Sequence, residues 1–137
     1  MSLKKNYFFV LIFLCYSSTS KAQESSIFDI ARRGSLTELK LIIKSDQNII
    51  NKISKEGYSA LVLACYYSNN EIASYLIKHV KDINSKSSYG TPLMAAAIKK
   101  NSYLTKLLLE NNADPNLSDQ NNSTALHYSV IFNQEKI

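Results

Sequence analysis

The sequence predicts an all-α solenoid, a row of stacked helix–turn–helix units. A repeat near 33 residues, apolar side chains at helical spacing and a hydroxyl before each first helix together predict it. The repeat appears as SALVLACYYSN (59–69), TPLMAAAIKKN (91–101) and TALHYSVIFNQ (124–134). In these stretches Leu61, Leu93 and Leu126 align with spacings of 32 and 33, and a fainter copy, IFDIARRGSL, begins at Ile27.

The first helix of each unit is marked by its cap and by one face of small residues. A hydroxyl before the helix can accept a hydrogen bond from an otherwise unpaired backbone N–H. The residues predicted to cap in this way are Ser59, Thr91 and Thr124. Pro92 follows one cap, at a position where its fixed φ is favourable. The small residues, which allow neighbouring helices to approach closely, are Ala64, Cys65, Ala96 and Ala97.

The second helix of each unit carries longer apolar side chains at helical spacing. They are Leu36, Leu39, Ile42 and Ile43 in the first unit, Ile72, Ala73, Leu76 and Ile77 in the second, and Leu104, Leu107 and Leu108 in the third. A polar turn closes each unit. The clearest lies in LLLENNADPN (107–116), where we expect Asn112 to adopt the left-handed conformation of a helix C-cap.

Residues 1–22 have the order of a secretory signal peptide. Lys4 and Lys5 precede ten uncharged, mostly apolar residues (7–16), and small and polar residues follow. Ser20 and Ala22 suit the small-residue positions of a cleavage site, so we expect cleavage before Gln23.

A membrane anchor and a buried core helix are the alternatives for this apolar stretch. Ten helical residues span about 15 Å, half of a bilayer core, which argues against an anchor. A lipid-attachment role for Cys15 is rejected, because the large Leu14 stands where a small residue is needed. We therefore expect no stable membrane insertion after cleavage.

Composition and charge exclude several classes. The chain of 137 residues has the size of one domain, and 45% hydrophobic and 20% charged residues exclude pervasive disorder. Removal of Lys4, Lys5 and Lys21 lowers the basic count from 16 to 13 against 11 acidic residues, a net charge of +2. Nucleic-acid binding needs a basic stripe, so we expect none. The exported chain keeps one cysteine, Cys65, and therefore has no internal disulfide.

GTPLMAAA (90–97), LLLENNADPN and STALH (123–127) resemble ankyrin repeats, a family with a 33-residue period and a T-P-L-H-x-A pattern. The resemblance covers about residues 25–137. The second unit departs from the pattern, with Val62 in place of the histidine and Val80 and Lys81 in place of Gly-Ala. We divide the chain into a signal peptide, 1–22, and a repeat domain, 23–137, with units of about 25–54, 55–86, 87–118 and 119–137, the last incomplete.

The resemblance implies stacked units with β-hairpin loops projecting from one side, each unit contacting only its neighbours. The first unit looks like an amino-terminal cap. The sequence stops where the second helix of the fourth unit should begin, so we expect Leu126 and Val130 to lack part of their cover. We favour a fragment of a longer protein. The alternative is a last helix that is frayed or paired elsewhere.

The sequence offers no catalytic, cofactor or metal site. His127 occupies the T-P-L-H position, where we expect a structural hydrogen bond to Thr124, and His79 ends a second helix. Cys65 is expected to be a buried, inert thiol. Asp82 and Asp114 suit turns better than paired catalytic carboxylates.

In ankyrin-type proteins, partners generally dock on the hairpin tips and the ends of the first helices. Transferred by position, the expected partner-binding residues are Arg32, Arg33, Lys55, Glu56, Tyr58, Tyr66, Tyr67, Ser88, Tyr89, Lys99, Asn121 and Phe132. Packing between repeats is an equally good explanation for four apolar or aromatic positions, Tyr66, Ile98, Ile131 and Phe132. We favour binding for Arg33, Tyr58, Tyr67 and Tyr89, because tyrosine and arginine dominate binding hot spots.

These observations predict a non-enzymatic protein-binding module, monomeric and exported to the periplasm or secreted. Its alternatives are an inhibitor or immunity-type protein for an envelope enzyme or toxin, the recognition arm of an enzyme whose catalytic part lies beyond Ile137, and a cytoplasmic scaffold. The partner itself cannot be named, because the same repeat serves unrelated partners.

Overall fold

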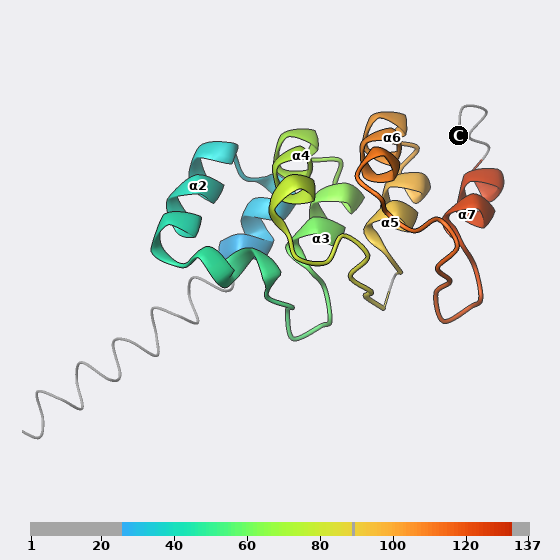
Figure 1. Ribbon diagram of the computed structural model, residues 1–137, viewed down its shortest axis with the longest axis horizontal. Coiled ribbons are helices and arrows are strands. Elements are labelled where there is room, and N and C mark those ends of the chain that lie inside the picture. Colours follow the sequence, from blue (N-terminus) through green and yellow to red (C-terminus); the bar gives the residue numbers. More distant parts are fainter. Residues whose placement is uncertain (1–25, 89, 133–137) are drawn as a thin grey trace, which may run out of the picture.

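The computed structural model describes residues 26–88 and 90–132 as paired helices placed side by side (Figure 1). Residues 26–33 are helical and precede α2 (Leu36–Ser45) and a 3₁₀-helix, η1 (Gln47–Asn51). Two complete pairs follow, α3 (Ala60–Tyr66) with α4 (Asn70–His79) and α5 (Pro92–Ile98) with α6 (Ser102–Glu110). The last described element is α7 (Ala125–Ile131). The expected all-α repeat solenoid is confirmed.

The first helices and the second helices form two rows. In Figure 1, α3, α5 and α7 lie in one row and α2, α4 and α6 in the other. Along the first row, α3 packs on α5 and α5 on α7. The small residues predicted for these contacts, Ala64, Cys65, Ala96 and Ala97, are all buried. Because these side chains are short, the backbones of adjacent first helices can come close enough to exclude water.

Two of the three predicted caps form the expected hydrogen bond, whereas Thr124, the N-cap of α7, forms no side-chain cap bond. Ser59 Oγ accepts from the N–H of Val62 at 3.1 Å, and Thr91 Oγ1 accepts from that of Met94 at 3.3 Å. Pro92 occupies the first turn of α5, where its missing N–H removes no helical bond.

α2 begins with a reciprocal capping box. Ser35 donates to a carboxylate oxygen of Glu38 from its N–H at 2.7 Å and from its hydroxyl at 2.9 Å. The same hydroxyl accepts from the N–H of Glu38 at 3.3 Å. The backbone and hydroxyl donors of Ser35 lower the pKa of Glu38.

Asparagine side chains join successive layers. Asn51 Oδ1 accepts from the N–H of Lys81 at 2.8 Å, and Asn84 Oδ1 accepts from that of Asp114 at 2.9 Å. The two asparagines are one repeat apart in the sequence, and the two residues whose N–H groups they accept from are also one repeat apart. Backbone N–H groups of the turns are thereby satisfied by the preceding layer.

The loops before the first helices project to the same side of the molecule, at the bottom of Figure 1. Within the described residues two of them are hairpins held by single bridges, Ile53 with Ser59 and Ser87 with Gly90, and the loop before α7 is closed by a bond of 3.0 Å from the N–H of Asp119 to the carbonyl of Ser123. The expected hairpins are therefore present in a short form, because each loop brings only one pair of residues into register before the next helix starts.

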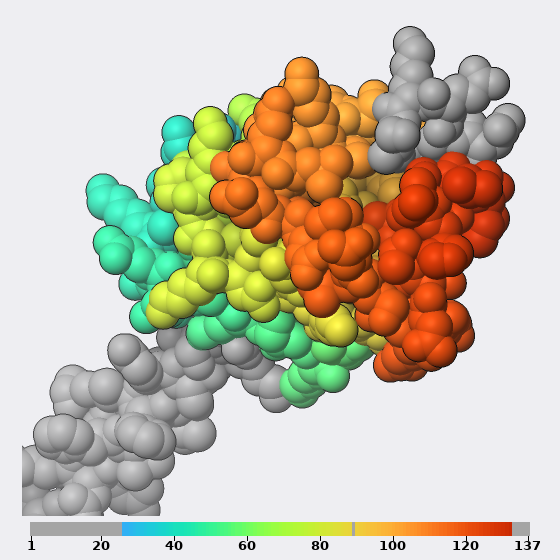
Figure 2. Space-filling view, turned by 45° about the vertical axis from the view of Figure 1, so that its right-hand side comes forward, coloured from blue at the N-terminus to red at the C-terminus, as the bar shows by residue number. Residues whose placement is uncertain are grey.

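α7 ends the described stack, and its outward face is open (Figure 2, red). Leu61 and Leu93 are 0% and 2% exposed, whereas Leu126, at the same position of its helix, is 63% exposed. Val130 is 71% exposed. The expected loss of cover at Leu126 and Val130 is confirmed, and Asn112 has the predicted left-handed conformation, with φ of 66°.

Three expectations fall outside the described residues. They concern the signal peptide (1–22), Tyr89 and the end of the last unit (133–137). Among the residues that are described, no helix is long and apolar enough to cross a membrane.

Candidate functional site

One exposed position recurs at the end of each first helix. Arg33 closes the helical segment 26–33, and Tyr67, Lys99 and Phe132 are the C-cap residues of α3, α5 and α7. All four are exposed, including the aromatic Tyr67 at 52%. We call these four residues the ladder. It places a large, exposed side chain at the end of the first helix in every described layer.

Beside the ladder lies a cavity of about 340 Å³, which we call the first-helix pocket. Arg32 contributes from the preceding layer and Tyr58 from the first hairpin. The remaining lining residues belong to α3 and its cap: Val62, Leu63, Tyr66 and Tyr67. The pocket thus joins four of the expected partner-binding residues (Arg32, Tyr58, Tyr66 and Tyr67) with an apolar floor that the sequence did not single out.

Tyr66 is the centre of this arrangement. Its ring meets that of Tyr67 edge to face, with centroids 5.4 Å apart. Lys99 Nζ, from the next layer, lies 4.6 Å from the centroid of the Tyr66 ring, a cation–π contact. Tyr66 is half-buried and packs against the core while lining the pocket. Both explanations offered for it from sequence, packing and exposure to a partner, therefore describe its position.

Arg32 lines the pocket while paired with an acid of its own helix. Its Nη1 donates to Asp29 Oδ1 at 3.2 Å, one helical turn earlier. A guanidinium has five N–H donors, so this contact uses only part of its donor capacity.

The first hairpin tip presents Lys55 and Glu56, both exposed. The tip is closed by a bond of 2.8 Å from the N–H of Ser54 to the carbonyl of Tyr58, and Gly57 supplies the positive φ of 84°. The pKa of Glu56 is lowered by hydrogen bonds from its own backbone and from Ser54, and secondarily by Arg32 and Lys55.

The other expected residues are spread over separate loops and helix ends. Ser88 and Asn121 are exposed on the second and third hairpins. Ile98 is half-buried, as packing between repeats requires, whereas Ile131 and Phe132 are exposed at 66% and 38%. Only part of the expected surface therefore converges on one pocket.

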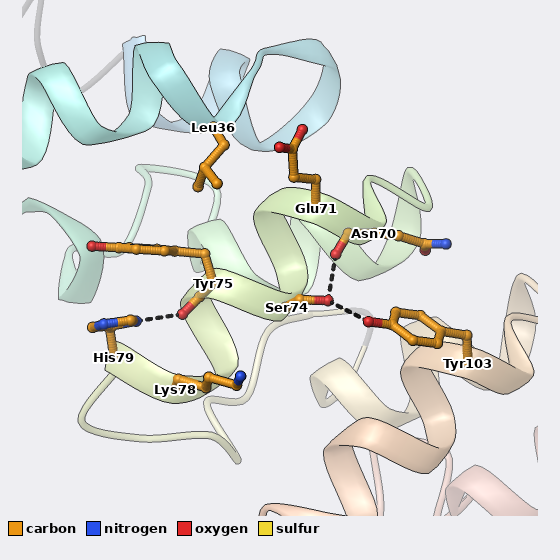
Figure 3. Close-up of a pocket in the computed structure, with 8 residues that line it drawn as sticks. All are labelled: Leu36, Asn70, Glu71, Ser74, Tyr75, Lys78, His79 and Tyr103. Atoms are coloured by element: carbon orange, nitrogen blue, oxygen red, sulfur yellow. Dashed lines mark hydrogen bonds between the residues drawn. The ribbon is translucent and has the colours of Figure 1, made fainter.

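Sequence reasoning did not identify a second, wider depression on the other row of helices. It measures about 690 Å³ and is lined by Leu36 of α2, Tyr103 of α6 and six residues of α4 (Figure 3): Asn70, Glu71, Ser74, Tyr75, Lys78 and His79. The rings of Tyr75 and His79 stack with centroids 4.0 Å apart, and the two residues are four apart on one helix. The spacing of four residues, which places two side chains on the same face of a helix, was the feature of the sequence that could have predicted this contact.

Cys65 and the two histidines have structural surroundings in the described part of the chain. Cys65 is fully buried, and burial raises the pKa of its thiol. His127 Nδ1 accepts from the N–H of Thr124 at 3.1 Å, which confirms the capping role expected from sequence. His79 donates from Nδ1 to the carbonyl of Tyr75 at 2.7 Å. Over residues 26–88 and 90–132, no three His, Cys, Asp or Glu side chains gather as metal ligands would.

Comparison with known proteins identifies the repeat. The family model described as ankyrin repeats (3 copies) matches residues 4–87, 27–119 and 81–137. An ankyrin repeat protein of Acanthamoeba polyphaga mimivirus is 31% identical over 106 residues, which are 74% of this chain and 14% of the viral protein. A fowlpox virus ankyrin repeat protein is 36% identical over 97 residues, 70% of this chain and 51% of its own length.

A bacterial relative, an ankyrin repeat-containing protein of Treponema pallidum, is 28% identical over 114 residues, 82% of this chain and 38% of that protein. The chain thus spans between about a seventh and a half of the length of these three relatives. Because the family model matches almost the whole chain and the helices stack as its repeats require, the chain belongs to the ankyrin repeat family.

Proposed function

We propose that this chain is an exported, non-enzymatic module that captures a partner protein on the surface formed by the hairpin tips and the first-helix ends. Ankyrin repeats are protein–protein interaction modules, which supports the general part of the proposal. The observation that carries the specific part is the ladder of Arg33, Tyr67, Lys99 and Phe132.

The ladder supports binding because the scaffold has no need of it. The neighbouring positions on the same helices, such as Cys65 and Ala97, are buried and small. The ladder position instead carries a large side chain in every described layer: an arginine, a tyrosine, a lysine and a phenylalanine. Burying such side chains against a partner releases their hydration water and supplies the anchors typical of hot spots.

The first-helix pocket lies next to this ladder and adds a cavity to the exposed surface. A cavity of about 340 Å³ is at the small end of ligand pockets and suits one or two side chains of a protein partner. Tyr58 and Tyr66 line it with the apolar Val62 and Leu63, so the pocket can hold an apolar or aromatic side chain.

Export rests on the sequence of residues 1–22, and the periplasm is the compartment we propose. The test is fractionation of cells that produce the chain with a carboxy-terminal tag, followed by sequencing of its amino terminus. We expect recovery outside the cytoplasm and a first residue of Gln23. A cytoplasmic product that still begins at Met1 would refute export and leave the binding surface untouched.

Partner capture tests the binding surface. Tyr67 and Phe132 are replaced by serine together, and the matched control is Tyr103→Ser, an equally exposed tyrosine on α6, in the other row of helices (55% exposed). Tagged proteins are used to recover partners from the envelope fraction. We expect the partner of the unmodified chain to be lost with the ladder variant and kept with the control. Retention by the ladder variant would refute the proposed surface.

The same experiment separates binding from inhibition. If the recovered partner is an enzyme and loses activity when mixed with the chain, the inhibitor or immunity-type alternative replaces a scaffold or adaptor role.

A further inference from the structure

The two rows of helices differ in charge. The first helices and the turns that follow them, 26–34, 60–68, 92–100 and 125–132, carry four cations and one acid: Arg32, Arg33, Lys99 and Lys100 with Asp29. The second helices carry four cations and three acids: Lys40, Lys44, Lys78 and Lys106 with Glu38, Glu71 and Glu110. The excess of positive charge is therefore concentrated on the row that bears the ladder and the first-helix pocket.

Two of these cations are linked to Tyr66 in different ways. Arg32 lines the first-helix pocket together with Tyr66, and Lys99, which is not a lining residue, has its Nζ 4.6 Å from the centroid of the Tyr66 ring. Among the described residues, no carboxylate forms a salt bridge with Arg33, Lys99 or Lys100. Asp29 pairs with Arg32, and Glu56 is the other acid near the pocket. Counted with Lys55 and Glu56 of the first hairpin, the first-helix row carries five cations and two acids.

Apolar side chains also line the pocket. Val62 and Leu63 of α3 line it together with Tyr58 and Tyr66. An apolar or aromatic side chain of a partner can pack against Val62 and Leu63, and carboxylates beside it would reach the cations. Charge-assisted bonds of this kind are about twice as strong as neutral ones.

We propose that the first-helix pocket binds an acidic, extended protein segment in which an apolar side chain is flanked by carboxylates. The apolar side chain enters the pocket over Val62 and Leu63. One carboxylate pairs with Arg32 and another with Lys99. This inference rests on the proposed function, since it names the chemistry of the partner segment at the same surface.

A nucleic acid would also be attracted to this charge, but the geometry favours a peptide. Phosphate recognition draws its affinity from many cations along a continuous stripe. Here the cations are few, and a single one, Arg32, lines a cavity of about 340 Å³ whose other lining includes Val62 and Leu63. An oligonucleotide is therefore included in the test as a competing ligand.

The test uses three probes on the purified protein. They are a twelve-residue peptide of Glu and Ser with one central Phe, the same peptide with Gln for Glu, and a twelve-residue thymidine oligonucleotide. Binding is followed by ¹H–¹⁵N NMR at about 0.15 M salt, where the Debye length is about 8 Å. We expect the Glu peptide to bind, with shifts around Tyr58, Tyr66 and Lys99, and to bind at least about tenfold more tightly than the Gln peptide.

A charge-matched pair of variants locates the effect. Arg32→Gln with Lys99→Gln removes two charges from the pocket, and Lys44→Gln with Lys106→Gln removes two from the second helices. The pocket variant is expected to weaken the Glu peptide about tenfold and the control less than about twofold, since long-range charge effects are screened. Thermal unfolding of both variants checks that each is folded, and Lys99→Gln alone provides a milder version.

Several results would overturn the proposal: no binding of the Glu peptide at millimolar concentration, equal binding of the Gln peptide, equal weakening by both variants, or tighter binding of the oligonucleotide. The partner-capture experiment described above distinguishes failure of the acidic-segment proposal from failure of the proposed binding surface. If Tyr67→Ser with Phe132→Ser abolishes capture but the pocket charge variant leaves it unchanged, the binding surface stands and the acidic segment does not.

Discussion

Replacing Leu93 or Leu126 by alanine tests how much the stacking of layers contributes to stability. The two leucines occupy equivalent positions of the repeat, so each substitution is the control for the other. Both leucines are the second residue of their first helix, and both follow a threonine N-cap. Leucine and alanine have similar helix propensities, so the local effect of the two substitutions is small and similar. The two sites differ in cover, because Leu93 is 2% exposed and Leu126 is 63% exposed.

The expected magnitudes follow from that difference. Truncating a fully buried leucine loses its transfer free energy and leaves a cavity, which together cost about 3 kcal/mol. Leu126 is only about one-third buried, and its open face leaves no enclosed cavity. Its truncation should cost about 0.5–1 kcal/mol. Leu93→Ala should therefore lower the free energy of unfolding by about 2 kcal/mol more than Leu126→Ala.

Urea unfolding followed by circular dichroism at 222 nm measures both values, and equal m-values establish that the comparison is valid. Leu61→Ala, in the fully buried layer of α3, should match Leu93→Ala. Equal losses for Leu93→Ala and Leu126→Ala would refute the reasoning, because they would mean that α7 is covered in solution as deeply as α5.

Four further substitutions or measurements test local features. Lys100 has φ of 56°, so Lys100→Gly should relieve backbone strain and raise the melting temperature by a few degrees in a thermal scan. Within the described residues Thr105 Oγ1 is buried without a hydrogen-bond partner, so Thr105→Val should add about 1 kcal/mol in urea unfolding. Cys65 should react with a thiol reagent only as fast as the protein unfolds, since the thiol is buried and its pKa is raised. The Tyr128 hydroxyl donates to Asp119 and, with the N–H of Ser123, lowers the pKa of that carboxyl, so its contribution to stability is present above about pH 4 and is lost as the pH falls. NMR titration of Asp119 should show the lowered pKa, and Tyr128→Phe should move it upward.

The repeated features of this fold were predictable because each appears several times in the sequence. The caps at Ser59 and Thr91 and the left-handed Asn112 depend on neighbours within about four residues, so a short sequence pattern contains the required interactions. The burial of Leu61 and Leu93 followed from their spacing, since one repeat places them at equivalent points of successive layers.

The pocket was predictable only in part. Tyr58, Tyr66 and Tyr67 were identified as surface residues by their repeat position, but the contact of Lys99 with the Tyr66 ring was not. That contact joins side chains 33 residues apart, and it depends on the rotation of one layer relative to the next. A repeat length fixes which positions are equivalent and leaves this rotation open, so the neighbours across layers could not be inferred.

The contrast between core and ladder explains where function can be sought in such a chain. The equivalent position of the first helix carries leucine at 61, 93 and 126. Leu61 and Leu93 are buried there between successive layers. The ladder position takes Arg33, Tyr67, Lys99 and Phe132, four different chemistries at one geometric site. Packing in the core does not select these differences, since all four side chains are exposed. A partner protein contacts each layer with a different part of its surface, so binding would favour a different side chain at each ladder position. The ladder position, and not the buried leucine position, is therefore where substitutions should be used to test for binding.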